Sequence, residues 1–278
     1  MKGSDVSSRM KEMLFARASE LKAKGINPAL AIIRVGRRED DLVYERAILK
    51  RFNPLGLTVN VHELPEDISQ EDFNAEFMRL NDNPEVHGLL LFRPLPAGLS
   101  DEYVCLNMNP RKDIDGMSPV NAARIFAGER EGFAPCTPSA VMVMLAQYGY
   151  DVSGMNVVIV GRSMVVGRPL AMLMLRANAT VTVCHTKTHN LPEICKKADI
   201  VIAAAGHPKM LTQEYFTKKS IVVDVGIDTD EQGNLCGDVD FERVSGFVKA
   251  ISPVPGGVGA VTTSVLAEHL IMAARLGA

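Results

Sequence analysis

The stretch "VVIVGRSMVVGRPL" (157–170) joins a short β-branched run to two glycines and a proline. A continuous apolar run of this kind is typical of a strand that is covered on both faces. Gly161 ends the strand, Gly167 lets the next helix begin close to it, and Pro169 suits the first turn of that helix. The free backbone N–H groups at such a helix start attract anions, so the stretch predicts a dinucleotide phosphate site.

Arg162 and Ser163, between the two glycines, are expected to add side-chain donors to this site. The spacing is G-x5-G, which is neither G-x-G-x-x-G nor a Walker A motif, so a structural glycine turn is the alternative. The following strand ends in "CHTKT" (184–188), which offers Thr186 and Lys187 and no carboxylate. NAD sites usually place Asp or Glu there to bind the ribose, so NADP is favoured over NAD. A solvated loop is the alternative for these two residues.

Short apolar runs alternate with helical patterns on both sides of this stretch. Asp40 or Asp41 is expected to cap the second helix, and Thr137 the helix that follows the Pro- and Gly-bearing connection. Strands are predicted at 29–36, 57–64, 88–96, 156–161, 180–185, 199–206 and 220–227, and helices at 5–24, 40–52, 69–82, 137–149, 167–178 and 262–277.

This alternation predicts an α/β protein with two parallel sheets, the second Rossmann-like. The predicted boundaries are 1–118 for the first domain and 119–261 for the NAD(P)-binding domain. The C-terminal segment 262–278 is expected to form a helix that packs back on the first domain. A chain of 278 residues is long enough for two modest domains.

The composition excludes several classes of function. The net charge is −3, so no basic surplus points to nucleic acid or an anionic membrane. No apolar run is long enough to span a bilayer. The five cysteines are scattered without a CxxC pair, which argues against a disulfide framework and a metal site. We therefore expect a cytoplasmic protein with reduced thiols.

Two further segments carry candidate site residues. Asp115, in a loop at the predicted domain junction, can accept paired hydrogen bonds from an aminopyrimidinone edge such as a pterin, although an Asx-turn is the alternative. Gly256 and Gly257 allow the backbone to approach a flat ligand, and Pro253 stiffens their loop. A tight turn is the alternative there.

The strings "KDIDG" (112–116), "PCTP" (135–138), "GRSMVVGRPLAMLML" (161–175), "GDVDF" (237–241) and "PVPGGVG" (253–259) occur in this order. The ordered set resembles the methylenetetrahydrofolate dehydrogenase/cyclohydrolase family over essentially the whole chain. The resemblance implies a homodimer with a tetrahydrofolate derivative in a cleft between two domains. It also implies oxidation of methylenetetrahydrofolate to methenyltetrahydrofolate with NADP, which most members follow by hydrolysis to formyltetrahydrofolate.

The predicted site combines these observations with the resemblance. Its catalytic candidates are Tyr44, Asp115 and, as a further basic group, Lys50. Its substrate-binding residues are Tyr44, Asp115, Pro253, Gly256 and Gly257; its cofactor-binding residues are Gly161, Arg162, Ser163, Gly167, Thr186, Gly206, Ile227 and Thr262; no metal ligand is predicted.

The chain departs from the family at two partnered positions. The family helix reads Tyr-x-x-x-Lys, and aligned on Tyr44 the lysine position is Ile48. Lys50 projects about 120° from Tyr44 around a helix, against about 40° for Ile48, so it is no shifted copy. The glutamine that contacts the family lysine is replaced by Phe92 in "LFRPLP" (91–96). Because an unpaired buried polar group is costly, the two changes look like a coordinated removal.

A third departure places Asp41 at a family serine. Hydride transfer needs no side chain to shuttle a proton, whereas hydrolysis of the methenyl bridge needs a positioned acid or base. We therefore expect dehydrogenase activity with weak or absent cyclohydrolase activity. The alternatives are a bifunctional enzyme in which Arg93 or Lys50 reaches the site, and a non-catalytic folate- or nucleotide-binding protein.

Overall fold

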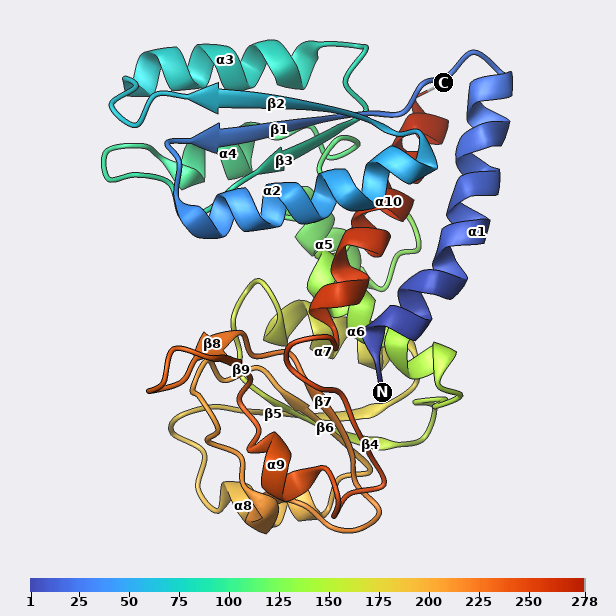
Figure 1. Ribbon diagram of the computed structural model, residues 1–278, viewed down its shortest axis with the longest axis vertical. Helices are drawn as coiled ribbons and strands as arrows, with labels where there is room; N and C mark the ends of the chain where they lie inside the picture. The colour runs from blue at the N-terminus through green and yellow to red at the C-terminus, as the bar shows by residue number, and fades with distance from the viewer. Residues whose placement is uncertain (278) are drawn as a thin grey trace. The chain divides into compact units, whose positions relative to one another are not determined.

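A computed structural model describes residues 1–277 as two compact units (Figure 1). Unit 1 contains Met1–Ser8 and Thr137–Thr262, and unit 2 contains Arg9–Cys136 and the chain from Thr263 onward. Helices α1 (Gly3–Ala23) and α10 (Gly259–Leu276) therefore contribute residues to both units. The boundaries drawn from the sequence stay a prediction.

Unit 2 is built on a parallel three-stranded sheet in the order β2-β1-β3. Strand β1 is the central strand and is buried along its whole length, as its continuous apolar run predicts. Helices α2 and α3 lie on opposite faces of the sheet (Figure 1). The elements of unit 2 other than α1 and α10 are β1 (Ala29–Val35), α2 (Glu39–Phe52), η1 (Asn53–Leu55), β2 (Thr58–Leu64), α3 (Gln70–Asp82), β3 (Gly88–Leu91), α4 (Asp101–Asn107) and α5 (Pro119–Ala127).

One core of unit 2 forms where α3 and α4 cover one face of this sheet. Phe73 and Phe77 of α3 are fully buried against alternate residues of β1 such as Ile33. Ser69 begins α3 as its N-cap, because its hydroxyl accepts a hydrogen bond from the backbone N–H of Asp72. The cap and the apolar stripe together fix the helix on the sheet.

The start of α2 differs from the prediction. The N-cap residue is Arg38, with no side-chain cap in the described chain, so neither Asp40 nor Asp41 caps the helix. The carboxylate of Asp41 instead accepts two hydrogen bonds from the Arg38 guanidinium, at 2.9 and 2.7 Å. The Asp41 carboxylate thus accepts charge-assisted hydrogen bonds from Arg38 in place of the backbone N–H groups that a capping residue would bind. Helix α6 likewise begins at Cys136, so Thr137 lies inside it.

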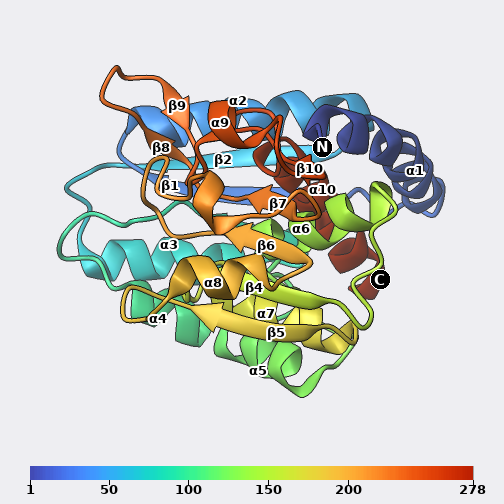
Figure 2. The same cartoon turned by 90° about the horizontal axis from the view of Figure 1, so that it is seen from below.

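Unit 1 is built on a parallel five-stranded sheet in the order β10-β7-β6-β4-β5 (Figure 2). One face of this sheet supplies a core that includes Val160, Val201 and Val222. Residues of α8 and α9 cover that face. The elements of unit 1 are α6 (Cys136–Gln147), β4 (Asn156–Val160), α7 (Gly167–Arg176), β5 (Thr180–Cys184), α8 (Leu191–Lys196), β6 (Ile200–Ala203), η2 (Gln213–Tyr215), β7 (Ile221–Asp224), β8 (Asp228–Thr229), β9 (Leu235–Cys236), α9 (Phe241–Val244) and β10 (Ala250–Ile251).

Two α/β units with parallel sheets confirm the predicted fold class. Strand β4 lies between β5 and β6. The chain passes from β4 to β5 on one side and then crosses to β6 on the other side. In open α/β sheets, ligands bind at such a switch point, at the carboxyl ends of the strands. Within residues 1–277, every helix is too short or too polar to cross a lipid bilayer.

Candidate functional site

The end of β4 is packed tightly against the segment after β6 and the start of α7. A Cβ atom on Gly161 would lie 1.9 Å from the carbonyl oxygen of Ala204, and one on Gly167 would lie 2.2 Å from the carbonyl oxygen of Gly161. Gly161 also has a φ of +133°, which side-chain-bearing residues rarely adopt. Only glycine fits at either position, so the backbone can form a close cradle at the switch point.

Replacing Gly161 by Ala is expected to disrupt this cradle. Because the new methyl group must displace backbone, we expect the free energy of unfolding to fall by about 1–3 kcal/mol. Affinity for NADP should fall about tenfold, since the loop amides lose their positions. Thermal unfolding and calorimetric titration measure the two effects. Gly246→Ala is the matched control, because a Cβ there meets no atom within 4 Å; equal behaviour of both variants would contradict the prediction.

The loop between these glycines presents donors to solvent. Arg162 and Ser163 are exposed, and the Ser163 hydroxyl accepts a hydrogen bond from the backbone N–H of Val166 at 3.1 Å. In the described chain α7 has no side-chain N-cap. In its first turn the N–H groups of Arg168 and Leu170 donate to the carbonyl oxygens of Ser163 and Val166, and Pro169 has no N–H. The N–H of Gly167 is the first-turn donor that is left to an anion in the described chain.

The segment after β5 carries no carboxylate from Cys184 to Asn190. Thr186 and Lys187 are both exposed there. The turn is held internally, because the backbone N–H of Lys187 donates to Nδ1 of His185 at 3.1 Å. A hydroxyl and an ammonium at this place suit a 2′-phosphate, and a carboxylate would repel it.

A cavity of about 300 Å³ in unit 1 gathers the remaining predicted residues of that unit, except Gly206. It is lined by the segment after β7, which includes Ile227, and by the loop that leads into α10. Ile227 is 68% exposed. The predicted residues on its wall are Ile227, Pro253, Gly256, Gly257 and Thr262. The structure thus brings together positions that are far apart in the sequence.

The loop that lines this cavity depends on its two glycines. Gly256 has a φ of +94°, and a Cβ on Gly257 would lie 2.3 Å from the carbonyl oxygen of Pro253. Thr262 donates its hydroxyl hydrogen to the carbonyl oxygen of Val258 at 3.2 Å. The loop therefore presents backbone rather than side chains, as a flat ligand requires.

Asp115 lies in a loop of unit 2 that Asp113 supports from beneath. Asp113 accepts backbone N–H groups of Met117 and Ser118, at 2.9 and 2.8 Å. Asp115 itself accepts the backbone N–H of Cys136 at 3.0 Å. Burial raises the pKa of Asp115, and the Cys136 N–H partly offsets this. The carboxylate is therefore held in one orientation.

Tyr44 lies beside this carboxylate. Burial, together with Asp115 and Cys136, raises the pKa of the Tyr44 phenol well above its ordinary value. The Tyr44 ring packs on the ring of Phe92, with centroids 5.5 Å apart. The phenol thus stays protonated at neutral pH, and it sits between an acidic and an aromatic neighbour.

The two departures lie on the buried side of α2 and at the end of β3. Ile48 is fully buried and Phe92 is 5% exposed. Lys50 is exposed. The structure therefore brings Tyr44, Asp115 and Phe92 together and leaves Lys50 at the surface of α2. An apolar pair occupies the positions where the resembled family carries a lysine and a glutamine.

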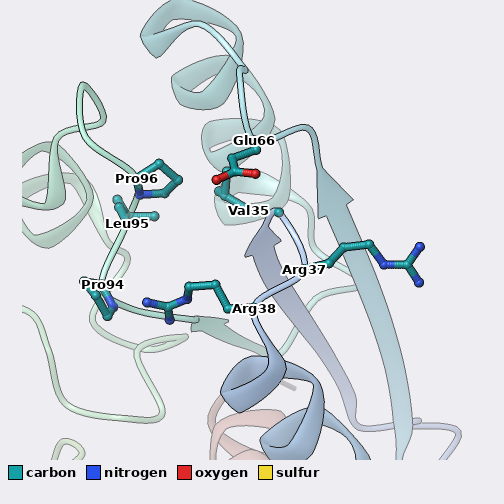
Figure 3. A pocket seen from close by; sticks show the side chains of 8 residues that line it. Val35, Arg37, Arg38, Glu66, Pro94, Leu95 and Pro96 are labelled. Atoms are coloured by element: carbon teal, nitrogen blue, oxygen red, sulfur yellow. The ribbon is translucent and has the colours of Figure 1, made fainter.

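A second cavity of about 310 Å³ opens at the start of α2. Arg38 points toward Pro94 on its wall, and Arg37 turns away from it (Figure 3). The Arg38 guanidinium also donates to the carbonyl oxygen of Arg93 at 3.0 Å, and Arg93 pairs with Asp101 at 3.1 Å. Arg38 therefore holds the loop after β3 to the start of α2, and Arg93 holds the same loop to α4.

Two structural residues, His269 and Asp238, were missed by sequence reasoning. His269 of α10 contacts the carbonyl oxygen of Ile114 at 2.8 Å through Nδ1, and its Nδ1 lies 3.7 Å from the Cys136 thiol. Asp238 accepts backbone N–H groups from another segment. A histidine in an apolar helix and an acid between Gly and Val were the available signals. Among residues 1–277, no group of three or more His, Cys, Asp or Glu is placed to hold a metal.

Comparison with known proteins covers nearly the whole chain. Residues 1–115 match the catalytic domain of tetrahydrofolate dehydrogenase/cyclohydrolase, and residues 135–277 match its NAD(P)-binding domain. Bifunctional protein FolD of Clostridium botulinum is 50% identical over 273 residues, which are 98% of this chain and 97% of that protein.

Solved structures agree with this match. Bifunctional FolD methylenetetrahydrofolate dehydrogenase/cyclohydrolase from Campylobacter jejuni has a TM-score of 0.96 at 39% identity, covering 99% of this chain and 98% of that one. The Trypanosoma brucei methylenetetrahydrofolate dehydrogenase-cyclohydrolase, solved with NADP and an inhibitor, has a TM-score of 0.92 at 33% identity, covering 99% and 97%. The resemblance inferred from the sequence is confirmed: the chain belongs to the tetrahydrofolate dehydrogenase/cyclohydrolase family.

Proposed function

We propose that this protein oxidises methylenetetrahydrofolate to methenyltetrahydrofolate with NADP and hydrolyses the product weakly or not at all. The observation that carries the proposal is the apolar surrounding of Tyr44: its ring packs on Phe92, Ile48 one helical turn further is fully buried, and the charge of Asp115 acts on its phenol. Tyr44 and Asp115 keep the side chains that are proposed to bind the folate. Ile48 and Phe92 stand at the positions where the resemblance implies a lysine and a glutamine for proton transfer.

The residues of unit 1 fit NADP. The cradle at Gly161 and Gly167 admits no side chain, so a pyrophosphate can approach the backbone at the start of α7, where the N–H of Gly167 is the donor left to it. Arg162 and Ser163 add donors, and Thr186 with Lys187 suits the 2′-phosphate. NADP when bound supplies a nicotinamide that accepts a hydride from the methylene carbon of the folate.

The folate is assigned to Tyr44 and Asp115 of unit 2. Pro253, Gly256 and Gly257, on the cavity wall of unit 1, stay predicted substrate-binding residues. The Asp115 carboxylate can accept two donors from the aminopyrimidinone edge, and the Cys136 N–H fixes its orientation. Tyr44 offers a flat ring backed by Phe92. Holding the reacting carbon in one place is the main contribution that hydride transfer asks of a protein.

Hydrolysis of the methenyl bridge asks for more, because water must be activated and a tetrahedral adduct must collapse. The Ile48 and Phe92 side chains cannot transfer protons. The Tyr44 phenol, with its pKa well above the ordinary value, is a poor base at neutral pH. The buried residues of α2, which are Asp41, Ile48 and Phe52, thus include no basic group.

The main alternative is a bifunctional enzyme in which Lys50 or Arg93 supplies the missing group. Lys50 is exposed, and Arg93 is paired with Asp101. A guanidinium also stays charged, so it shuttles protons poorly. A non-catalytic binding protein is the third possibility. We further propose a cytoplasmic homodimer, which the resemblance to the family supports; light scattering of the purified protein tests the oligomeric state.

One assay separates these functions. With methylenetetrahydrofolate and NADP supplied, we expect NADPH to form while the methenyl compound accumulates and decays only at the buffer rate. Both products are followed by absorbance. Faster decay that is lost in Lys50→Ala or Arg93→Ala would support the bifunctional alternative. No NADPH with either nicotinamide cofactor, despite measurable binding of one, would favour the binding protein.

A further inference from the structure

Two buried carboxylates of unit 1 fix the segments that follow β6 and β7. Asp238 is fully buried, and its carboxylate accepts the backbone N–H of Ala205 at 2.7 Å through Oδ2 and that of His207 at 2.7 Å through Oδ1. These two bonds span Gly206. The segment that leaves β6 is therefore held at both ends by one side chain.

Asp224, the last residue of β7, does the same for its own segment. Its Oδ1 accepts the backbone N–H groups of Gly226 and Asp238, at 3.0 and 3.1 Å. Its Oδ2 accepts the backbone N–H of Val239 at 2.9 Å. Asp224 thereby joins the segment after β7 to the segment that carries Asp238. The two carboxylates form one continuous set of bonds.

Packing around the two carboxylates excludes side chains. A Cβ on Gly237 would lie 2.1 Å from Oδ2 of Asp224, and one on Gly226 would lie 2.6 Å from the carboxyl carbon of Asp238. Both distances are far below ordinary contact. The backbone therefore closes directly onto the carboxylates, and its N–H groups donate to both. Burial still raises the pKa of both carboxyl groups, that of Asp224 to about 7.

One of these bonds lies on the cavity wall, because Asp224 and its donor Gly226 both line the cavity. The cavity of about 300 Å³ is lined by residues 224–227 together with the loop that leads into α10. The predicted cofactor-binding residues Gly206 and Ile227 lie on the two segments that the carboxylates hold. Both segments follow the carboxyl ends of parallel strands, where the nicotinamide is expected in such a sheet. Neither carboxylate needs to touch the cofactor to act on it.

We infer that Asp238 and Asp224 are positioning residues that fix the nicotinamide end of the NADP site. This inference rests on the proposed function, because it assigns the cofactor to this cavity. The carboxylate is required because both of its oxygens accept. An isosteric amide has one oxygen, and its NH2 group faces an N–H donor at the other position.

The test is Asp238→Asn, titrated by calorimetry with NADP and with 2′-phospho-ADP-ribose, which is NADP without its nicotinamide. The variant should bind NADP about tenfold or more weakly, because it loses a hydrogen bond to a charged acceptor. It should bind the fragment like the wild type, since the cradle at Gly161 is untouched. In turnover, kcat should fall while KM for the folate stays unchanged. Asp240→Asn is the matched control: Asp240 caps α9 two residues away, and we expect no change in either titration.

Asp224→Asn provides a second variant if Asp238→Asn does not fold, and the same pattern is expected. Unchanged NADP affinity in the folded variants would overturn the inference. Equal weakening of NADP and of the fragment would overturn it too, because that points to general damage of unit 1. A wild type that binds NADP without oxidising the folate sinks the proposed function alone. A wild type that binds no NADP sinks both.

Discussion

Replacing Ile48 by Lys together with Phe92 by Gln is expected to raise methenyltetrahydrofolate hydrolysis at least about 100-fold, because a positioned general acid or base typically contributes that much. The measurement is the decay of the methenyl compound with enzyme in excess, after subtraction of the buffer rate. NADPH formation from methylenetetrahydrofolate should change by only a few-fold. Hydride transfer does not use the restored proton donor.

The reason for changing both residues is visible in their surroundings. Ile48 is fully buried, and Phe92 lies against the Tyr44 ring. A lysine alone would place its ammonium among apolar groups, and a glutamine alone would leave its amide without a partner. Together they can hydrogen-bond to each other beside Tyr44. Two apolar residues therefore suit each other at these positions. A variant with only one of them replaced carries a buried polar group without a partner and is expected to be less stable.

The single variants are the controls for this interpretation. Ile48→Lys and Phe92→Gln should each gain little hydrolysis and should each unfold at a lower temperature than the double variant. Lys50→Ala, on the exposed side of α2, should leave both activities unchanged. A folded double variant that hydrolyses no faster than the wild type would contradict the proposed cause of the loss.

The strands that carry the two sheets were predictable because they are buried on both faces. β1, β4, β6 and β7 read as continuous apolar runs, and glycine or proline bounds them. Short elements such as α5, the β8–β9 pair and β10 were not predicted. A strand of two residues gives no periodic pattern, and it forms only because a neighbouring strand supplies its partners.

Site residues, too, differ in whether the local sequence predicts them. Gly161 and Gly167 could be predicted locally as a tight strand-to-helix turn, since a strand followed by glycines and a proline indicates close backbone packing. The roles of Asp238 and His269 depend on contacts with segments more than 30 residues away, at Ala205 and Ile114. Asp41 is a case in which the local pattern misleads. An acid at a helix start predicts an N-cap, but the Asp41 carboxylate accepts hydrogen bonds from the Arg38 guanidinium instead.

Asp115→Asn should lower kcat/KM for methylenetetrahydrofolate about 100-fold, if Asp115 binds the pterin edge as proposed. The amide has one acceptor where the carboxylate has two, and the hydrogen bonds that it loses are charge-assisted. The backbone N–H of Cys136 can still be accepted, so the loop should keep its shape. Steady-state kinetics with varied folate, alongside thermal unfolding, measures the effect.

The comparison that decides this role uses NADP. Asp115→Asn should bind NADP like the wild type, because Asp115 belongs to unit 2 and the proposed cofactor residues belong to unit 1. Asp67→Asn, an exposed acid in unit 2, should behave as the wild type in every assay. Loss of folate turnover with NADP binding intact assigns Asp115 to the substrate. Equal kcat/KM in the folded variant would remove it from the site, and Tyr44 would then remain as the proposed substrate contact on that unit.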